Sequence, residues 1–258
     1  MKKVSILVAT HKKYEMPEYK SYLPIHVGKK DKKSIGFKGD DTGENISEKN
    51  PNFCELTGVY WAWKNLKSDY VGLVHYRRYF KGKTKSKNKF ECVLSDKEIN
   101  ELLKDNDIIL PKKRNYYIET LYSHYEHTMY IEPLDITGEI IKKKYPKYYD
   151  EFELLKKRKT AHMFNMFIMK KEIMDEYCKW LFAILFELEK KVDNSKYDSF
   201  HARFFGRVSE LLLDVWLNTN GYKYKEVPVM SMEKVNWWKK GTSFLKAKFL
   251  GKKYGKSF

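Results

Sequence analysis

The sequence predicts an α/β fold, a sheet flanked by helices, on three observations. Patterns typical of strands and of helices alternate through most of the chain. Two compact apolar runs, residues 4–9 and 70–74, have the short, bulky and β-branched character of buried parallel strands. The apolar fraction of 42% and the aromatic fraction of 16% are large enough for a sizeable core, which excludes global disorder. We therefore expect one domain over residues 1–233 and a separate tail over residues 234–258.

The remaining strands are predicted from short apolar or alternating runs that end at breaker residues. Pro111 stops the strand that begins at Asp107, and Asn165 is a polar interruption in an otherwise apolar run. The expected strands lie at residues 22–27, 107–110, 160–169 and 223–229.

The helices are predicted from apolar residues at three- and four-residue spacing and from their capping residues. Ser95 and Glu98 form a capping box, and Asn52 and Asp135 are candidate N-caps. Pro146 suits a first helical turn. The expected helices lie at residues 53–66, 95–104, 135–144, 146–157, 171–192 and 203–217.

The most informative stretch is D-Y-V-G-L-V-H-Y-R-R-Y-F, residues 69–80, where a buried strand runs directly into polar and cationic side chains. Ligands of open α/β sheets bind outside the carboxyl ends of the strands. Arginine stays charged and suits bidentate phosphate recognition. We therefore expect this edge to hold the diphosphate of a nucleotide-sugar, with surface arginines paired to nearby acids as the alternative. The candidate donor-binding residues are His75, Tyr76 and Arg78, and Arg77 is assigned a catalytic role.

A second set of polar residues follows the first predicted strand. Thr10, His11 and Lys13 come at its carboxyl end, where a nucleotide base and ribose would sit. The chain has neither a G-x-G-x-x-G motif nor a Walker motif, which argues against a dinucleotide enzyme and a P-loop kinase. The donor site is therefore expected at two strand ends.

Residues 28–52 form a long, polar stretch that contains several glycines and no periodic pattern. Loops of this length in compact domains are usually either functional or disordered. We expect a substrate loop that orders on binding, with Asn45 and Asn50 as substrate-binding residues. Asp40 and Asp41 are either a metal site or ordinary turn-forming residues.

Further substrate-binding candidates come from helices and a strand. Glu55 and Thr57 lie near the start of a predicted helix, where a helix can face a ligand. Asn165 is a buried polar residue that needs a partner, which a sugar hydroxyl would supply. His124 and His127 have a spacing that suits a metal on a helix, but no third ligand is evident. An aromatic wall for a sugar ring and plain packing are the alternatives for that tyrosine-rich segment.

The formal net charge of +17 predicts an anionic partner: a nucleic acid, a membrane surface or a phosphorylated substrate. No nucleic-acid-binding motif is present, and lysines gather in residues 81–89 and in the tail, so no nucleic acid is expected as a partner. The tail interleaves lysines with aromatic residues and has no acid, which is typical of a membrane-surface segment. No apolar run is long enough to span a bilayer. The three scattered cysteines indicate a reduced, cytoplasmic chain.

Several motifs together resemble a family of bacterial capsular and exopolysaccharide glycosyltransferases that carries the H-Y-R-R-Y-F signature and was long described as a domain of unknown function. The resemblance extends over nearly the whole chain. It implies a glycosyltransferase-A-like fold, a mixed sheet flanked by helices. It also implies transfer from UDP-galactofuranose or UDP-galactose to a lipid-linked oligosaccharide. The motifs are N-I-S-E-K-N (45–50), F-C-E-L-T-G-V-Y-W-A-W-K-N (53–65), residues 69–80, F-N-M-F-I-M and G-R-V-S-E-L-L-L-D.

The wider glycosyltransferase-A class usually has a metal-binding D-x-D motif after the central strand, where this chain has His75-Tyr76-Arg77. Fixed positive charge at that place would neutralise the leaving diphosphate without a metal. No cofactor is therefore expected, with Mn²⁺ or Mg²⁺ as the alternative. The class also places an acid early in a late helix, which makes Glu210 the candidate general base, ahead of Asp214 and Glu55. Arg207 is assigned to substrate binding, or to an ion pair with Glu210.

These inferences predict an inverting hexosyltransferase of capsular or exopolysaccharide synthesis. Its expected partners are a UDP-sugar, a lipid-linked oligosaccharide and an anionic membrane surface. Its expected location is the cytoplasmic, inner face of the bacterial cell membrane. A retaining transferase of the same fold and a basic nucleic-acid-binding protein are the alternatives.

Overall fold

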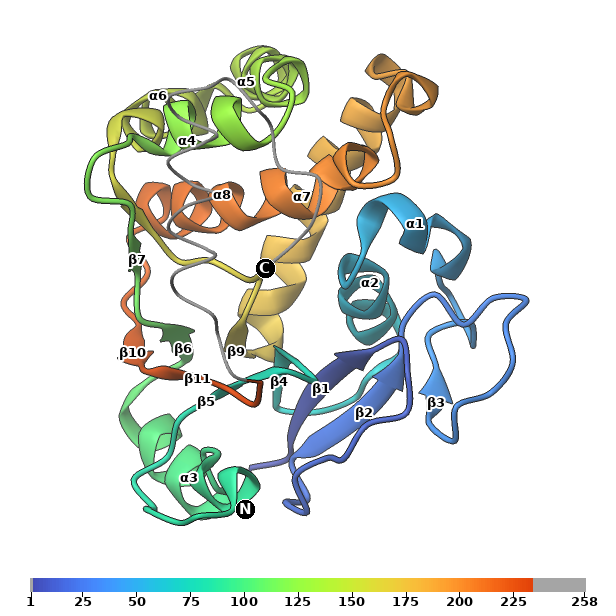
Figure 1. The fold of residues 1–258 in the computed structure, drawn as a ribbon. Helices are drawn as coiled ribbons and strands as arrows, with labels where there is room; N and C mark the ends of the chain where they lie inside the picture. The colour runs from blue at the N-terminus through green and yellow to red at the C-terminus, as the bar shows by residue number, and fades with distance from the viewer. Residues whose placement is uncertain (1, 234–258) are drawn as a thin grey trace.

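The computed structural model describes residues 2–233, which form a mixed sheet flanked by helices (Figure 1). The predicted fold class is confirmed. The main sheet has the strand order β10-β6-β9-β4-β1-β2-β3, with β5 and β11 attached beside β4. The tail predicted over residues 234–258 lies outside the described residues.

The strands are short, and the longest lie at the centre of the sheet. Their bounds are β1 Val4–Thr10, β2 Tyr22–His26, β3 Lys38–Gly39, β4 Tyr70–His75, β5 Arg78–Phe80, β6 Ile108–Pro111, β7 Arg114–Asn115, β8 Thr160–Ala161, β9 Phe167–Lys170, β10 Lys225–Val227 and β11 Val229–Ser231.

Helices make up most of the second half of the chain. Their bounds are α1 Asn50–Phe53, α2 Leu56–Asn65, α3 Asp96–Asp105, α4 Leu121–Thr128, α5 Glu132–Lys144, α6 Tyr149–Lys157, α7 Lys171–Lys191 and α8 Phe204–Thr219, with short 3₁₀ turns at Ser47–Lys49, Lys89–Cys92, Pro146–Tyr148, Asn194–Lys196 and His201–Arg203.

The direction of pairing changes at β9, which makes the sheet mixed. β1 pairs in parallel with both β2 and β4, so the three strands end at the same edge. β9 runs antiparallel to β4 on one side and to β6 on the other. The carboxyl ends of β1 and β4 therefore lie beside the amino end of β9, and the segment entering β9 meets their polar ends.

The core has two parts, one on each face of the sheet, because side chains alternate along each strand. Leu7 and Ala9 of β1 pack with the large helical layer, which includes α2, α7 and α8. Ile6 and Val8 pack on the other face with α3 and the aromatic residues of β5. Figure 1 shows α3 on the opposite side of the sheet from those long helices. The apolar run at residues 4–9 was therefore correctly predicted as a strand buried on both faces.

Two of the predicted elements are interrupted at residues with left-handed backbones. The helix predicted over 53–66 is two helices, α1 and α2, separated at Cys54, whose φ is 54°. The strand predicted over 160–169 is β8 and β9, separated by Phe164 and Asn165 with φ of 76° and 53°. The residues on each side of both breaks are buried, so the apolar pattern of the sequence continues across them. Hydrophobic periodicity therefore does not reveal either break.

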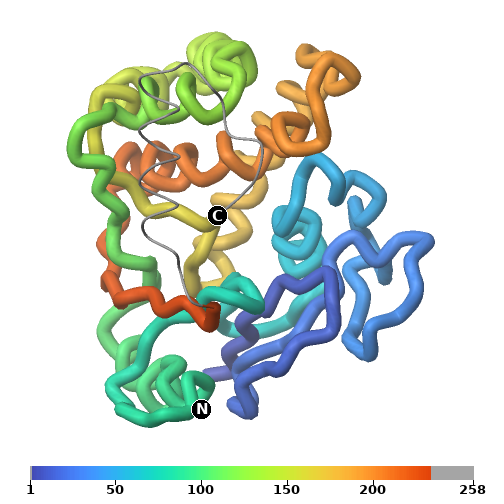
Figure 2. The backbone as a smooth tube through the Cα atoms, in the orientation of Figure 1, coloured from blue at the N-terminus to red at the C-terminus, as the bar shows by residue number. Residues whose placement is uncertain are grey.

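The helix boundaries confirm some capping predictions and correct others. The capping box of Ser95 and Glu98 is present at α3. Asp135 is not an N-cap, because α5 begins earlier, at Glu132, with a proline in its first turn. Asn52 lies inside α1 and caps neither helix. The strand predicted over 223–229 is two short strands, β10 and β11. Figure 2 shows that the last of these returns to the middle of the molecule, where β11 pairs with β5.

Gly72 in β4 is required by the close approach of β9, so Gly72→Ala should destabilise the fold. An added Cβ would lie 2.7 Å from the backbone oxygen of Phe167, which cannot move without disturbing the ladder. We expect a loss of about 2–3 kcal/mol in the free energy of unfolding, measured by urea denaturation.

Gly206→Ala is the matched control for that variant. Gly206 lies in α8, and a Cβ there would meet nothing closer than 3.9 Å. Since alanine is the better helix former, this change should be neutral or stabilising by up to about 1 kcal/mol. Equal effects of the two substitutions would contradict the close-packing argument.

Candidate functional site

The polar end of β4 turns back on itself within two residues. Tyr76 and Arg77 form the turn, and His75 pairs directly with Arg78 of β5. Residues opposite each other in an antiparallel pair point to the same face. His75 and Arg78 therefore share a face, whereas an uninterrupted strand would have placed His75 with Arg77.

Both of these side chains meet Phe164, in the segment that enters β9. Nε2 of His75 lies 2.6 Å from the backbone oxygen of Phe164, and the guanidinium of Arg78 lies 4.6 Å from the centre of its ring. The left-handed φ angles of Phe164 and Asn165 are uncommon outside glycine and cost on the order of 1–3 kcal/mol each. Such backbone strain gathers at functional sites, so this corner belongs to the candidate site.

Asn165 connects the corner to two helices. Its Nδ2 donates to Oε1 of Glu55 at 2.7 Å, at the start of α2, and to the backbone oxygen of Gly206 in α8 at 3.1 Å. Its Oδ1 is buried and has no hydrogen-bond partner among the described residues. An unsatisfied buried acceptor is rare in folded proteins and is suited to a donor from outside the chain, such as a hydroxyl.

Glu210 lies on α8, directly behind the corner, and is only 5% exposed. Its Oε1 accepts a hydrogen bond from the backbone N–H of Phe164 at 3.2 Å, and its Oε2 lies 3.4 Å from Nη1 of Arg207. Burial raises the pKa of Glu210, while the neighbouring Arg207 opposes that shift. A carboxylate with a raised pKa is a stronger base than an exposed one.

Cations surround this carboxylate. Burial, followed by repulsion from Arg77, lowers the pKa of the Arg78 guanidinium. The pKa of Arg207 is raised, chiefly by Glu210, and that of Arg203 is raised chiefly by Cys54, whose Sγ accepts a hydrogen bond from Nε at 3.0 Å. Arg77 pairs with Glu233 at 3.2 Å, and Arg207 pairs with Glu210. With Arg78 and Arg203, these four arginines outnumber the carboxylates of Glu55, Glu210 and Glu233, so the site is suited to an anion.

The end of β1 borders the same turn. The rings of His11 and Tyr76 are in edge contact at 5.4 Å, and Lys12 and Arg77 stack on Tyr76 at 5.3 and 5.1 Å. Burial and the nearby Arg77 lower the pKa of His11, which favours a neutral imidazole at pH 7. Thr10 is buried and its hydroxyl bonds to the backbone oxygen of Lys12, so it shapes the turn.

The structure thus brings together many of the candidates predicted from sequence, at the meeting point of β1, β4, β9, α2 and α8. It adds Phe164 and Arg203, which the sequence analysis did not single out. The left-handed backbone at Phe164 has no clear signal in the sequence. The polar Asn165 beside it was the feature that pointed to this segment. The predicted residues in this group are His11, Glu55, His75, Tyr76, Arg77, Arg78, Asn165, Arg207 and Glu210, while Lys13 is exposed at its margin.

The candidates of the long loop lie in a different arrangement, around the buried carboxylate of Asp40. This carboxylate accepts hydrogen bonds from the backbone N–H groups of Gly28 and Lys29 and from the hydroxyls of Ser47 and Thr57. Asp40 therefore fastens both ends of the loop to the start of α2.

The predicted substrate-binding residues of that loop are themselves hydrogen-bonded within it. Asn45 accepts from the backbone of Ser47 at 3.1 Å, and Asn50 donates to Thr57 at 3.3 Å. Asp41 lies 3.7 Å from Lys29 in a partly exposed ion pair. Among the described residues, no cluster of three or more His, Cys, Asp or Glu side chains could hold a metal ion.

His124 forms part of a further cluster on α4. The carboxylate of the buried Glu119 bonds to Nδ1 of His124 at 2.9 Å and to Nδ1 of His127 at 2.7 Å. The ring of Tyr116 packs on His124 at 4.0 Å. Burial lowers the pKa of His124 to about 4, against the opposing effect of Glu119, so this imidazole is neutral at pH 7.

Asp214, the nearest rival to Glu210, is occupied elsewhere. Its Oδ2 accepts from the backbone N–H of His162 at 3.0 Å and its Oδ1 bonds to Nδ1 of the same residue. Nε2 of His162 in turn lies 3.0 Å from Glu226 on β10. This buried chain joins α8 to the edge of the sheet and engages both oxygens of Asp214 with His162, two residues before Phe164.

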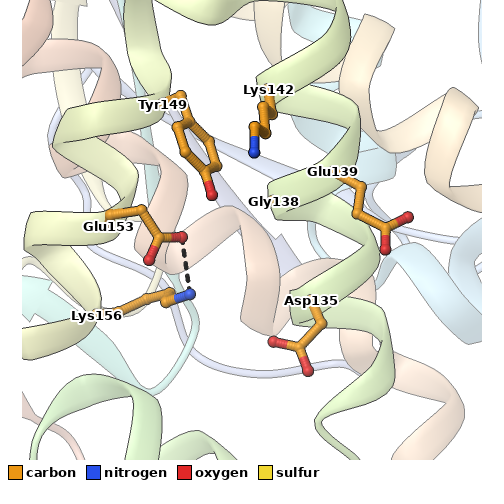
Figure 3. A pocket seen from close by; sticks show the side chains of 7 residues that line it. All are labelled: Asp135, Gly138, Glu139, Lys142, Tyr149, Glu153 and Lys156. Carbon is orange, nitrogen blue, oxygen red and sulfur yellow. Dashed lines mark hydrogen bonds and ion pairs between the residues drawn. The ribbon is translucent and has the colours of Figure 1, made fainter.

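A pocket of about 200 Å³ lies away from these groups, between α5 and α6 (Figure 3). Charged side chains surround it, and Lys156 pairs with Glu153 at 2.8 Å. The strand-end cations are not among its lining residues, so it is separate from the candidate site. None of the helices within residues 2–233 combines the length and hydropathy needed to cross a bilayer.

The comparisons with known proteins agree with this geometry. Residues 5–221 match the family model described as "Domain of unknown function (DUF4422)". The chain belongs to the DUF4422 family. It is also similar to the solved apo structure of the WbbM bifunctional glycosyltransferase, with a TM-score of 0.84 and 31% sequence identity over 90% of this chain.

That similarity extends over only 46% of the WbbM chain, so this DUF4422 chain spans about half the length of the relative. The match supports the glycosyltransferase-A-like fold of the mixed sheet. No curated protein matches the sequence.

The long loop of this DUF4422 chain, residues 28–52, gives a prediction that distinguishes the structural roles of Asp40 and Asp41. Asp40→Asn should lower the free energy of unfolding by about 2–4 kcal/mol, because the new amide would face the donors that the carboxylate now accepts from. Asp41→Asn, the matched control, should change it by no more than about 0.5 kcal/mol. Chemical denaturation measures both, and a larger loss for Asp41 would refute the assignment of Asp40 as the anchor.

Proposed function

We propose that this DUF4422 chain is a glycosyltransferase that moves a hexose, galactofuranose or galactose first, from a UDP-sugar to a lipid-linked oligosaccharide. The similarity to the WbbM bifunctional glycosyltransferase over 90% of this chain carries the proposal. The cationic group at the ends of β1 and β4 supports it, because sugar donors of this class present a diphosphate.

The donor diphosphate is proposed to lie against the β4–β5 turn. Arg78 and His75 share a face there, and Arg77 lies in the turn itself. The bond from the anomeric carbon to the diphosphate oxygen breaks during transfer, and negative charge develops on that oxygen. Arginines held in place by stacking on Tyr76 and Phe164 would stabilise the charge without rearranging.

Glu210 is proposed as the general base of an inverting transfer. Its carboxylate takes the proton of the acceptor hydroxyl as the hydroxyl oxygen attacks the anomeric carbon. Arg207 and the backbone N–H of Phe164 hold the carboxylate in place. The unpartnered Oδ1 of Asn165 is proposed to accept a hydrogen bond from a sugar hydroxyl.

A metal-independent reaction is proposed, because the place of an acidic metal motif is taken by His75-Tyr76-Arg77. Asp40-Asp41 is the main reason to expect a metal, but Asp40 already accepts hydrogen bonds from Gly28 and Thr57, and Asp41 lies 3.7 Å from Lys29. The enzyme is proposed to work at the cytoplasmic face of the cell membrane, where a lipid-linked acceptor is found.

Isothermal titration calorimetry with UDP tests the donor class. UDP should bind to the wild-type chain in EDTA, and Arg78→Ala should weaken binding by about tenfold or more, since a charge-assisted contact would be lost. Lys97→Ala is the control, because that exposed lysine lies on α3, away from the donor-binding candidates. No UDP binding, with another nucleotide bound well, would overturn the donor assignment. Activity lost in EDTA and restored by Mn²⁺ would overturn metal independence.

Glu210→Gln tests the base. It keeps the size of the side chain and an acceptor for Phe164, so UDP affinity and melting temperature should be retained. Turnover should fall by about a hundredfold or more. Glu55→Gln is the matched comparison, because Glu55 is the more distant candidate base and bonds to Asn165 of the same corner.

The pH profile gives a second readout of the same residue. Because the pKa of Glu210 is raised by burial, wild-type turnover should fall on acidification at a pH above the ordinary glutamate range. Near-normal turnover in Glu210→Gln, or an acidic limb that persists in it, would remove Glu210 from the mechanism.

A further inference from the structure

Tyr117 and Ile118 form an exposed apolar tip between β7 and α4. The side chain of Tyr117 is 76% exposed and that of Ile118 is 55% exposed. Exposed pairs of large apolar residues are costly in water and often mark an interaction site. We refer to these two residues as the apolar tip.

The backbone of the apolar tip is held in shape by its own hydrogen bonds. Tyr117 has a left-handed φ of 55°, and its N–H donates to Oδ1 of Asn115 at 2.7 Å. Just before it, the N–H of Tyr116 donates to the backbone oxygen of Lys159 at 2.9 Å. Just after it, the N–H of Leu121 donates to the backbone oxygen of Arg158 at 2.7 Å. The backbone is therefore held in a strained, left-handed conformation at a place where two apolar side chains are exposed to solvent.

Lysines flank the apolar tip on its own segment and on the neighbouring one. Lys112 and Lys113 precede it in the sequence, and Lys157 and Lys159 belong to the neighbouring segment that the tip is bonded to. All four lysines are exposed, and none forms an ion pair within the part of the chain that the structure describes. Against the effect of burial, a hydrogen bond to Tyr224 and the charges of Asp214 and Glu226 raise the pKa of Lys113, which lies 5.7 Å from the Tyr224 ring. The tip thus combines an apolar centre with a basic rim to which Lys112, Lys157 and Lys159 contribute most.

We propose that the apolar tip and its lysine rim dock on an anionic lipid surface, with Tyr117 and Ile118 inserted at the level of the headgroups. Aromatic and aliphatic side chains flanked by lysines are favoured at that boundary. A second copy of the chain fits less well, because a twofold contact would place the lysine rims of both copies together. An acceptor sugar fits less well too, since it would stack on Tyr117 but gain nothing from Ile118.

This inference deepens the proposed function. Tyr116, at the base of the apolar tip, packs on His124, and after Glu210 and Glu55 it also helps to raise the pKa of Arg207. Docking at the tip would therefore bring Tyr116 and the neighbouring Arg207 of the candidate site close to the membrane that carries a lipid-linked acceptor. Its residues are also distinct in sequence from those of the basic tail, because all of them lie before residue 160.

Vesicle flotation with the full chain tests the proposal, using phosphatidylglycerol–phosphatidylcholine vesicles and pure phosphatidylcholine vesicles. The double variant Tyr117→Ser, Ile118→Ser should lower partitioning to the anionic vesicles by about tenfold, since two inserting side chains are lost. Tyr117→Phe, Ile118→Leu keeps the apolar character and should bind as the wild type does. Tyr130→Ser is the positional control, because Tyr130 is exposed beyond the other end of α4.

Flotation needs no donor or acceptor, so its result is independent of whether the chain proves to be a glycosyltransferase. Unchanged partitioning of the serine double variant would overturn the proposal. So would an equal loss in Tyr130→Ser. Loss of self-association in analytical ultracentrifugation, with vesicle binding intact, would assign the apolar tip to a second copy instead. Loss of turnover on a water-soluble acceptor, with vesicle binding intact, would assign it to the acceptor sugar.

Discussion

The hydrogen bonds around the left-handed corner at Phe164 and Asn165 are the constraint on which the candidate site depends. The backbone oxygen of Phe164 meets His75, its N–H meets Glu210, and Asn165 meets Glu55. A single turn of the chain thereby fixes the end of β4, the start of α2 and the middle of α8. The local cost of the two left-handed residues is offset by these contacts, which span large separations in sequence.

The corner also explains how a buried acid persists among arginines. Glu210 would be expensive to bury alone, but its two oxygens are each satisfied, one by a backbone N–H and one by Arg207. Arg78 is held on the ring of Phe164, on the other side of the same turn. The carboxylate of Glu210 and the guanidinium of Arg78 are thus held on the same corner without pairing directly. This arrangement suits a reaction that needs a general base next to an anion-binding site.

Buried polar groups elsewhere serve the scaffold in a similar way. Asp40 closes the long loop, and the chain of Asp214, His162 and Glu226 ties α8 to β10. Both use carboxylates that a motif search would count as catalytic or metal-binding candidates. The difference lies in their donors: backbone N–H groups and hydroxyls surround Asp40, and an imidazole engages Asp214, so little of either carboxylate is left for a ligand.

The sequence by itself determined the α/β class, the buried strands β1 and β4, the capping box of α3 and the position of the cationic run after β4, because each depends on neighbouring residues and local periodicity. It also marked Asn165 as a polar interruption, without revealing that the strand breaks there. The tertiary structure decided that Glu210 bonds to the corner at Phe164 while Asp214 is engaged by His162, that Asp40 is an anchor, and that His75 shares a face with Arg78. Those outcomes depend on partners far apart in the chain, and only the packing of α8, β9 and the β4–β5 turn brings such partners together.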